Sequence, residues 1–181
     1  MNGENMVIWI TGLSGAGKTT VAKHLVSILK HEGIHVVHLD GDILRDIFFS
    51  DITGDPHSSG NRLRIAYKYS ALCDMLSKQG VTVVISTISL FHEIHKWNRD
   101  NILGYYEVYL DVPLSVLSSR NQKGLYKDYA AGYIDNICGL DIQSEFPQNP
   151  DLKIEYSEKI NAEKNAEHIY NKLKGVINEC K

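Results

Sequence analysis

The fold is decided by one stretch near the N-terminus, Met6-Val7-Ile8-Trp9-Ile10-Thr11-Gly12-Leu13-Ser14-Gly15-Ala16-Gly17-Lys18-Thr19. Its first half is a continuous apolar, β-rich run, which is typical of a strand buried on both faces of a parallel sheet. Its second half matches the pattern Gly-x-x-x-x-Gly-Lys-Thr of a phosphate-binding P-loop. Glycines are needed in such a loop because its backbone must bend until successive N–H groups point at phosphate oxygens.

Each part of this loop has a predicted role. Lys18 is expected to reach the β- and γ-phosphates of a nucleotide, and the Thr19 hydroxyl is expected on Mg²⁺. The helix that begins there adds its positive N-terminal end. We therefore expect ATP and Mg²⁺ as cofactors. The expected ATP contacts in this segment are Gly12, Leu13, Ser14, Gly15, Ala16, Gly17, Lys18, Thr19 and Thr20.

Strands and helices alternate along the rest of the chain. Further β-rich runs are found at residues 35–39, 81–86, 106–110 and 152–156. Helical patterns end near residue 31, cover residues 62–79, open at Pro113 and cover residues 160–177. This alternation implies right-handed crossovers. It predicts an α/β fold, namely the three-layer α/β/α sandwich of P-loop NTPases with a parallel sheet of about five strands.

Length and composition limit the possible classes of protein. A chain of 181 residues fits a single domain over residues 1–181, and 43% hydrophobic with 23% charged residues is typical of a soluble globular protein. The net charge of −3 provides no basic field for polymeric nucleic acid. Three widely spaced cysteines fit neither a disulfide framework nor a zinc site, which favours a reducing cytoplasm. No membrane span or export signal is expected.

Two carboxylates, Asp40 and Asp42, follow the second expected strand. Open α/β folds bind ligands at the carboxyl ends of their strands, so these side chains are expected to face the P-loop. Phosphoryl transfer to an alcohol needs a carboxylate to orient or deprotonate the hydroxyl and another to hold Mg²⁺ or its waters. We therefore assign Lys18, Asp40 and Asp42 as catalytic, and Thr19 and Asp40 as the metal site. Because Asp-Gly is also a common turn pair, a purely structural role stays open.

Three further segments have weaker signals. Residues 124–144 are mixed in character and contain glycines, which favours a mobile lid over a core element. His92 and His95 lie on one expected helix, but they lack the spacing and glutamate of a zinc-protease motif. Tyr67 and Tyr69 on the long helix are expected to pack against the sheet.

Taken together, these segments resemble the adenylylsulfate kinases, which transfer the γ-phosphate of ATP to the ribose 3′-hydroxyl of adenylylsulfate. The resemblance covers approximately residues 6–156. Beyond the P-loop it rests on Leu39-Asp40-Gly41-Asp42 with Arg45, Ile88-Ser89, residues 107–114, Arg120 with Lys123-Gly124-Leu125-Tyr126, Gly139-Leu140-Asp141 and Pro147-Gln148-Asn149-Pro150. Members of this family tend to form homodimers, and the resemblance implies the same here.

The resemblance also implies a substrate site. Its residues would be Asp42, Arg45, His57, Arg62, Ile88, Ser89, Lys123, Leu125 and Ile137. Within this set, Arg45 and Arg62 would hold the anionic group of the substrate, and Lys123 would act from the lid. Arg120 would lie over the ATP side. From the residues alone, Arg45 and Arg120 could also be ordinary helix charges, so both interpretations stay open.

Two departures from the family pattern concern the base of the acceptor. The family sandwiches adenine between two phenylalanines, whereas His57 and Ile137 occupy those positions here. At the start of the long helix, Asn61-Arg62-Leu63 replaces an Asp-Arg pair followed by Glu-Asn. Changed stacking and hydrogen-bonding contacts should change the preferred base. A branch of the family encoded with bacterial capsule genes phosphorylates cytidine diphosphoramidate, and we rank this acceptor narrowly ahead of adenylylsulfate.

A nucleotide-binding regulatory module is the alternative from another class, because it would also need a P-loop and Mg²⁺. Two observations favour the kinase. The sequence contains no guanine-reading Asn-Lys-x-Asp segment, and the Asp40-Gly41-Asp42 segment beside the P-loop suits an acceptor hydroxyl.

Overall fold

Five parallel strands form one sheet in the computed structural model, which describes residues 5–49, 54–55 and 57–179. Their order across the sheet is β2-β3-β1-β4-β5, and every neighbouring pair runs parallel. The strands are β1 (Val7–Thr11), β2 (Val36–Asp40), β3 (Thr82–Ser86), β4 (Tyr105–Asp111) and β5 (Leu152–Glu155). The predicted strands and sheet type are confirmed.

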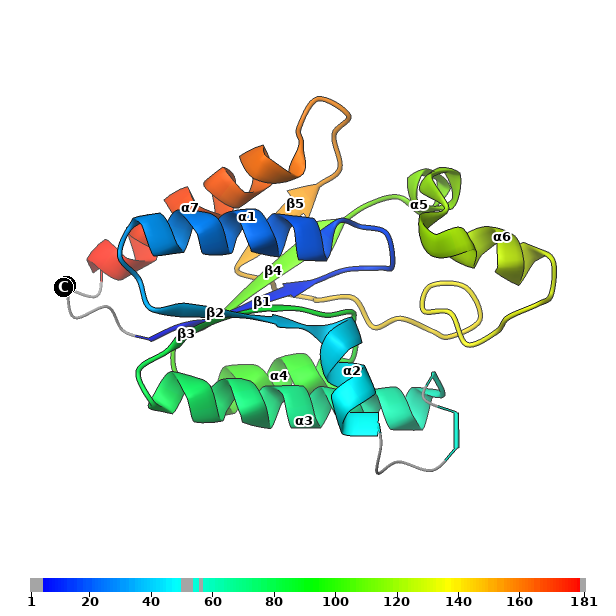
Figure 1. Ribbon diagram of the computed structural model, residues 1–181, viewed down its shortest axis with the longest axis horizontal. Helices are drawn as coiled ribbons and strands as arrows, with labels where there is room; N and C mark the ends of the chain where they lie inside the picture. Colours follow the sequence, from blue (N-terminus) through cyan, green and yellow to red (C-terminus); the bar gives the residue numbers. More distant parts are fainter. Residues whose placement is uncertain (1–4, 50–53, 56, 180–181) are drawn as a thin grey trace.

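Helices cover both faces of this sheet. Figure 1 shows α1 (Lys18–His31) and α7 (Ala162–Glu179) on one face, and α3 (Ser59–Lys78) and α4 (His92–Asn101) on the other. The shorter elements gather near the carboxyl ends of the strands: α2 (Gly41–Phe49), α5 (Leu114–Arg120), the 3₁₀ helix η1 (Gln122–Gly124) and α6 (Leu125–Ala130). The three-layer sandwich is therefore confirmed. No helix among the described residues is long and apolar enough to cross a membrane.

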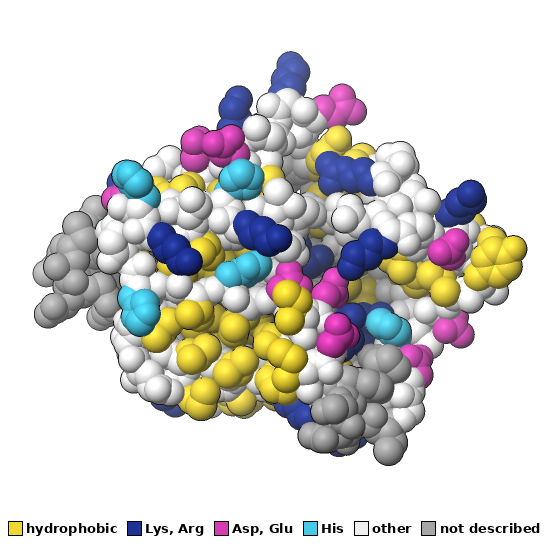
Figure 2. All heavy atoms as spheres, in the orientation of Figure 1, with side chains coloured by type: hydrophobic (Ala, Val, Ile, Leu, Met, Phe, Trp, Pro, Cys, Tyr) yellow, Lys and Arg dark blue, Asp and Glu magenta, His cyan; other side chains and the backbone are white. Residues whose placement is uncertain are grey.

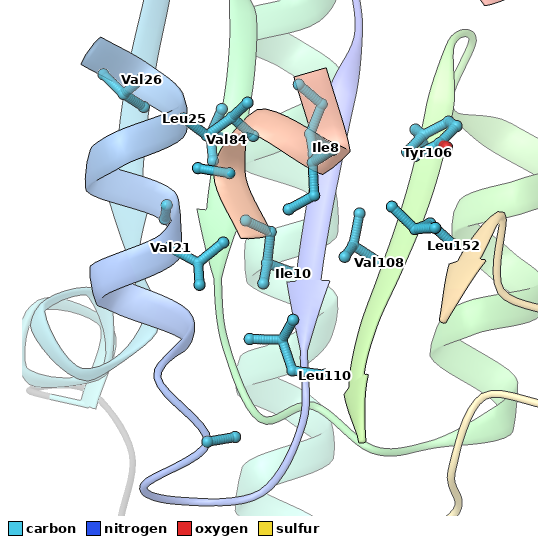
Figure 3. Close-up of a cluster of buried hydrophobic side chains, with 14 of the residues drawn as sticks. Ile8, Ile10, Val21, Leu25, Val26, Val84, Tyr106, Val108, Leu110 and Leu152 are labelled. Carbon is cyan, nitrogen blue, oxygen red and sulfur yellow. The ribbon is translucent and has the colours of Figure 1, made fainter. Parts of the chain in front are cut away.

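The central strand β1 explains why its sequence is apolar throughout. Ile8 and Ile10 belong to the core cluster on the α1 and α7 side, whereas Val7 and Trp9 belong to the cluster on the α3 and α4 side. Figure 3 shows Val21 and Leu25 of α1 over the side chains of the first cluster. Because each fully buried side chain of this size contributes about 1.5–3 kcal/mol, the two clusters fix the strand in the middle of the sheet.

The strand register brings distant segments of the chain to one edge. Ser86 at the end of β3 pairs with Ile10 of β1 on one side and with Asp40 of β2 on the other. The chain that follows each of these strands therefore leaves the sheet at the same level. This edge holds the P-loop, the start of α2 and the Thr87–Ser89 turn.

Some predicted boundaries differ from the structure. The long helix α3 begins at Ser59 instead of residue 62, and Pro113 lies immediately before α5 instead of inside it. Asp40 ends β2 and Gly41 opens α2, so the Asp-Gly pair is a direct strand-to-helix junction and not a separate turn. The predicted lid contains helix α6, and its Tyr126 and Cys138 are buried in the core cluster. Its mobility stays a prediction.

Candidate active site

The P-loop glycines adopt backbone conformations that other residues avoid. Gly12, Gly15 and Gly17 have φ angles of +146°, +80° and +94°. A Cβ atom added at Gly12 would lie 2.7 Å from the carbonyl oxygen of Leu110 on β4. Around Gly17 there is open space within 4 Å, so its requirement is conformational. The loop therefore has the geometry that the sequence motif predicts.

Lys18 opens α1 and lies beside a cavity of about 470 Å³ at the strand edge. Its Nζ donates a hydrogen bond of 2.8 Å to the carbonyl oxygen of Leu13 in its own loop. Burial lowers the pKa of this ammonium group to about 8, although Asp42 and Asp40 work in the opposite direction. A cation kept in a partly desolvated position interacts strongly with a phosphate group that enters the cavity.

Asp40 receives three hydrogen bonds. Thr19 donates from Oγ1 to Oδ2 at 2.7 Å, the amide of Asp42 donates to Oδ1 at 2.9 Å, and Ser86 donates from Oγ to Oδ2 at 3.2 Å. Partial burial disfavours the charged carboxylate, but these hydrogen bonds outweigh it and the pKa of Asp40 is lowered. Asp40 is therefore ionised and fixed beside the Thr19 hydroxyl. A carboxylate and a hydroxyl are oxygen donors of the kind that Mg²⁺ prefers.

Charged side chains close the cavity from two other directions. In the first turns of α2, Arg45 Nη2 lies 3.4 Å from Asp42 Oδ1. From η1, Lys123 reaches Asp42 with its Nζ 3.4 Å from Oδ2. Asp42 is exposed, and ion pairs to an exposed carboxylate contribute under about 1 kcal/mol to stability, so they are easily exchanged for contacts with a ligand. In Figure 2, acidic and basic side chains lie side by side between α1, α2 and the α5–α6 region.

The predicted catalytic and metal residues are thus brought together. One cavity is lined by Lys18, Thr19, Asp40 and Asp42 with the P-loop glycines Gly15 and Gly17. Arg45, Ile88 and Lys123 from the predicted substrate site line the same cavity. The arrangement places a phosphate cradle opposite two carboxylates, with cations at the rim.

A smaller cavity of about 20 Å³ adjoins this one and is lined by Arg45, Arg62, Ile88, Ser89 and Cys138, among others. Two guanidinium groups therefore point to one recess, as expected for residues that hold an anionic group. Burial lowers the pKa of Arg62.

Arg62 also connects two segments that are far apart in the chain. Its Nε donates to the carbonyl oxygen of His57 at 2.7 Å, and its Nη2 donates to the carbonyl oxygen of Asn136 at 2.8 Å. Arg62 thereby ties together the two positions that correspond to the family's phenylalanines, His57 directly and Ile137 through its neighbour Asn136. His57 is exposed and Ile137 is buried. Leu125 packs against the core cluster, and neither Leu125 nor Ile137 lines the two cavities described above.

On the other side of the P-loop, Arg120 occupies the predicted ATP side. Its Nη1 donates to the carbonyl oxygen of Gly15 at 3.1 Å, and its guanidinium lies 5.0 Å from the ring centre of Tyr156. A recess of about 190 Å³ is lined by Gly17, Thr20, Arg120 and Tyr156, among others. This recess continues from the phosphate loop and can accept the nucleoside of ATP.

Several residues of the site were not predicted. Ser86 binds Asp40, and His38 Nε2 lies 3.0 Å from Ser86 Oγ. Tyr126 donates from its hydroxyl to the carbonyl oxygen of Ser14 at 2.9 Å and so ties the lid segment to the P-loop. Ser86 could have been found from its place at the end of a predicted strand. The contact made by Tyr126 has no signal in the sequence.

Comparisons with known proteins agree with this geometry. The family model of adenylylsulphate kinase matches residues 4–155. A cytidine diphosphoramidate kinase from Campylobacter jejuni is 37% identical over 173 residues, which cover 96% of this chain and 99% of the relative. An adenylyl-sulfate kinase from Halothermothrix orenii is 36% identical over 179 residues, which cover 98% of this chain and 95% of the relative.

A solved structure of the same type is also similar. The APS kinase CysC of Mycobacterium tuberculosis, in complex with AMPPNP and APS, superposes with a TM-score of 0.85 at 30% identity. The match covers 95% of this chain and 99% of the other.

Proposed function

The chain belongs to the adenylylsulphate kinase family and is a phosphotransferase, and we propose that it transfers the γ-phosphate of ATP to the ribose 3′-hydroxyl of cytidine diphosphoramidate. The observation that carries the transfer chemistry is the position of Asp40, which lines the cavity at the P-loop and is kept ionised by its hydrogen bonds, the one from Thr19 among them. The choice of acceptor is supported by His57 and Ile137, since these positions provide no pair of phenylalanine rings for adenine.

Each residue has a defined part in the proposed reaction. The P-loop amides and Lys18 bind the β- and γ-phosphates, while Arg120 faces the nucleoside of ATP. Thr19 and Asp40 would hold Mg²⁺, which when bound neutralises part of the phosphate charge. As the acceptor oxygen bonds to the γ-phosphorus, the bond to the ADP oxygen breaks, and Asp42 takes the proton of the hydroxyl. Arg45 and Arg62 bind the tetrahedral anionic group of the acceptor.

Adenylylsulfate is the second candidate acceptor. It is favoured by the similarity to the H. orenii relative and to the M. tuberculosis structure, whose name includes APS. Arg45 and Arg62 can bind a sulfate group as well as a phosphoramidate group, since both are tetrahedral anions, so the phosphate and anion chemistry does not separate the two acceptors. The base of the nucleotide separates the two acceptors. A buried base is selected by its contacts, because the wrong base leaves polar groups of the site without hydrogen bonds.

A direct comparison tests this proposal. Purified protein with ATP and Mg²⁺ is offered each nucleotide in turn, and the product is identified by phosphorus NMR. We expect a 3′-phosphorylated product from cytidine diphosphoramidate with a higher kcat/KM than from adenylylsulfate. A preference for adenylylsulfate would assign the chain to the second candidate instead. Lys18→Met serves as the control, since it should reduce ADP release by more than about 100-fold.

Slow ADP release that is independent of either nucleotide would point to the regulatory module. That outcome would contradict the kinase proposal as a whole, because both candidate acceptors would then be inert.

We also propose that the protein is a homodimer in a reducing cytoplasm, with residues 124–144 acting as a lid. Ile43 and Ile47 of α2 and Met75 of α3 are exposed apolar side chains, and Figure 2 shows apolar side chains gathered on this side of the molecule. The proposal of a reducing cytoplasm is supported by Cys73 and Cys138, which are buried free thiols. Light scattering after gel filtration tests the dimer, and a monomeric mass would contradict it.

A further inference from the structure

The turn that follows β3 contains a strained residue at the recess for the acceptor. Ser89 is a buried, non-glycine residue with a φ of +31°, and it lines the small cavity together with Arg45 and Arg62. Such a backbone conformation is unfavourable and persists only where the surroundings hold it in place. The groups that hold Ser89 therefore control the shape of this recess.

Three side-chain contacts fix this turn, in addition to the hydrogen bond of 3.1 Å from the Phe91 amide to the Ser89 carbonyl oxygen. Thr11 at the end of β1 donates a hydrogen bond from Oγ1 to the carbonyl oxygen of Ile88. The hydroxyls of Thr87 and Ser89 lie 2.8 Å apart and bond to each other. From the helical layer behind the sheet, His95 of α4 places Nε2 3.1 Å from the carbonyl oxygen of Ser89. Of these three contacts, the bond from His95 is the one made to Ser89 by a side chain outside the turn.

Burial of a histidine at position 95 is energetically unfavourable. It is 7% exposed, and burial lowers its pKa to about 4, so the ring is neutral near pH 7. A carbonyl oxygen can only accept, so the single ring proton lies on Nε2, and Nδ1 is left as a buried nitrogen without a hydrogen-bond partner. Leaving a buried polar atom unpaired is destabilising. An apolar side chain would avoid this cost.

The same ring nitrogen also faces a carboxylate. Glu107 on β4 is 2% exposed, and its Oε1 lies 3.8 Å from His95 Nε2. Glu107 is itself bound by the Tyr105 hydroxyl at 2.9 Å, and Arg99 Nη2 lies 3.6 Å from its Oε2. The Glu107 carboxylate is thus engaged by Tyr105 and Arg99, and the shorter contact of His95 Nε2 is the one to the Ser89 carbonyl oxygen.

We propose that His95 is a positioning residue for the acceptor, because its Nε2–H holds the Ser89 carbonyl and thereby sets the shape of the recess shared with Arg45 and Arg62. The proposal rests on the proposed function in one respect, namely that Arg45 and Arg62 beside this recess bind the anionic end of the acceptor nucleotide. His95 lines neither the nucleoside recess nor the cavity at the P-loop, so we expect its effect on the acceptor and not on ATP.

Two substitutions at His95 and one control test the proposal. His95→Leu removes the donor, whereas His95→Gln keeps an N–H that can reach the same carbonyl oxygen. The control is Asn98→Leu, because Asn98 lies on the same helix, is 0% exposed and also has an unpaired polar atom, Oδ1. Its side chain bonds weakly to Tyr105 at 3.5 Å instead of contacting the turn.

The measured quantities are the KM for the acceptor and the KM for ATP in steady-state kinetics. Loss of one hydrogen bond is worth about 0.5–1.5 kcal/mol, so His95→Leu should raise the KM for the acceptor about 2- to 10-fold. The KM for ATP should stay within about 2-fold of wild type. His95→Gln should recover most of the acceptor affinity, and Asn98→Leu should leave it unchanged. An equal effect of His95→Leu and Asn98→Leu on the acceptor would reduce His95 to a core residue and overturn the proposal.

A second measurement does not depend on the identity of the acceptor. Nitrogen-15 NMR of the histidine side chains reports the tautomer, and we expect the proton of His95 on Nε2 together with a shift of the Ser89 amide signal in His95→Leu. A proton on Nδ1, or an unmoved Ser89 signal, would overturn the inference. If wild-type protein phosphorylates neither candidate nucleotide, the proposed function fails, whereas the NMR result still decides the role of His95.

Discussion

Asp40 shows how a single residue combines structural and chemical roles. Its two oxygens accept hydrogen bonds from Thr19, Asp42 and Ser86, and its lowered pKa keeps it negatively charged. An asparagine has the same size but only one accepting oxygen and no charge. One or more of the three donors would then lose its partner, and a bound cation would lose an anionic ligand.

We therefore predict that Asp40→Asn retains the binding of ATP but loses phosphoryl transfer. ATP binding persists because the P-loop amides and Lys18 are unchanged. The turnover number should fall by about 100-fold or more, in line with the loss of a positioned carboxylate. Calorimetric titration with a non-hydrolysable ATP analogue and measurement of ADP release separate the two effects. Wild-type turnover in this variant would remove Asp40 from the chemistry.

The second prediction at the residue scale concerns acid stability. Burial lowers the pKa of His95 from its ordinary value of 6.5 to about 4. Between these two values the unfolded chain binds a proton that the folded chain does not, so the stability from this residue is present above pH 6.5 and is lost as the pH falls. The loss between pH 7 and pH 5 should be about 2 kcal/mol.

Urea denaturation of wild type and His95→Leu at pH 7 and pH 5 measures this contribution of His95 to the free energy of unfolding. The variant should lose less stability than wild type over the same interval, since it has no imidazole to protonate. Identical pH dependence in the two proteins would show that His95 is protonated in the folded state near pH 5.

At the scale of the elements, the strands could be predicted more reliably than the helices. Strands buried on both faces give continuous apolar runs, which is why β1 and β3 were found within one residue of their observed bounds. The long helix was less well predicted. Tyr67 and Tyr69 were both expected in the core, but Tyr69 is buried and Tyr67 is 37% exposed. Residues two apart lie on nearly opposite sides of a helix, so both could not face the sheet.

The candidate site, too, could be predicted only in part from the sequence. The P-loop, Asp40 and Asp42 could be placed because each directly follows a predicted strand, and parallel strands end at one edge of a sheet. The role of His95 and the bonds of Arg62 could not be predicted. They depend on side-chain packing between α3, α4 and the segment after α6, and that segment has no periodic pattern from which its path could be read.

The loop between β1 and α1 allows a matched test of two glycines. Gly12→Ala should destabilise the protein more than Gly17→Ala, because the new Cβ would lie 2.7 Å from the Leu110 carbonyl oxygen, whereas open space surrounds Gly17. The second substitution should cost about 1–2 kcal/mol from its φ of +94° alone. The free energies of unfolding in urea provide the comparison. Equal destabilisation would mean that β4 moves away from the loop at little cost.

At the scale of the whole molecule, the segment from residue 124 to 144 is tied to the rest of the chain by few polar contacts. Arg62 bonds to the Asn136 carbonyl oxygen, and Asn136 Nδ2 donates to Asp55 Oδ2 at 2.7 Å. Tyr126 bonds to Ser14 in the P-loop. These contacts join the segment both to the acceptor side and to the ATP side. Binding of the two substrates should therefore affect the motion of one common element.

Arg62→Lys tests this connection, because an ammonium group cannot reproduce the fork that bonds to the His57 and Asn136 carbonyl oxygens together. We expect faster hydrogen exchange in residues 131–141 and an acceptor KM raised by about 10-fold, with ATP binding unchanged. Arg64→Lys, an exposed position on the same helix, is the matched control and should alter neither quantity. If Arg62→Lys raised the acceptor KM without changing the exchange of residues 131–141, Arg62 would act on the substrate alone. The segment would then be held closed by its contacts with the P-loop.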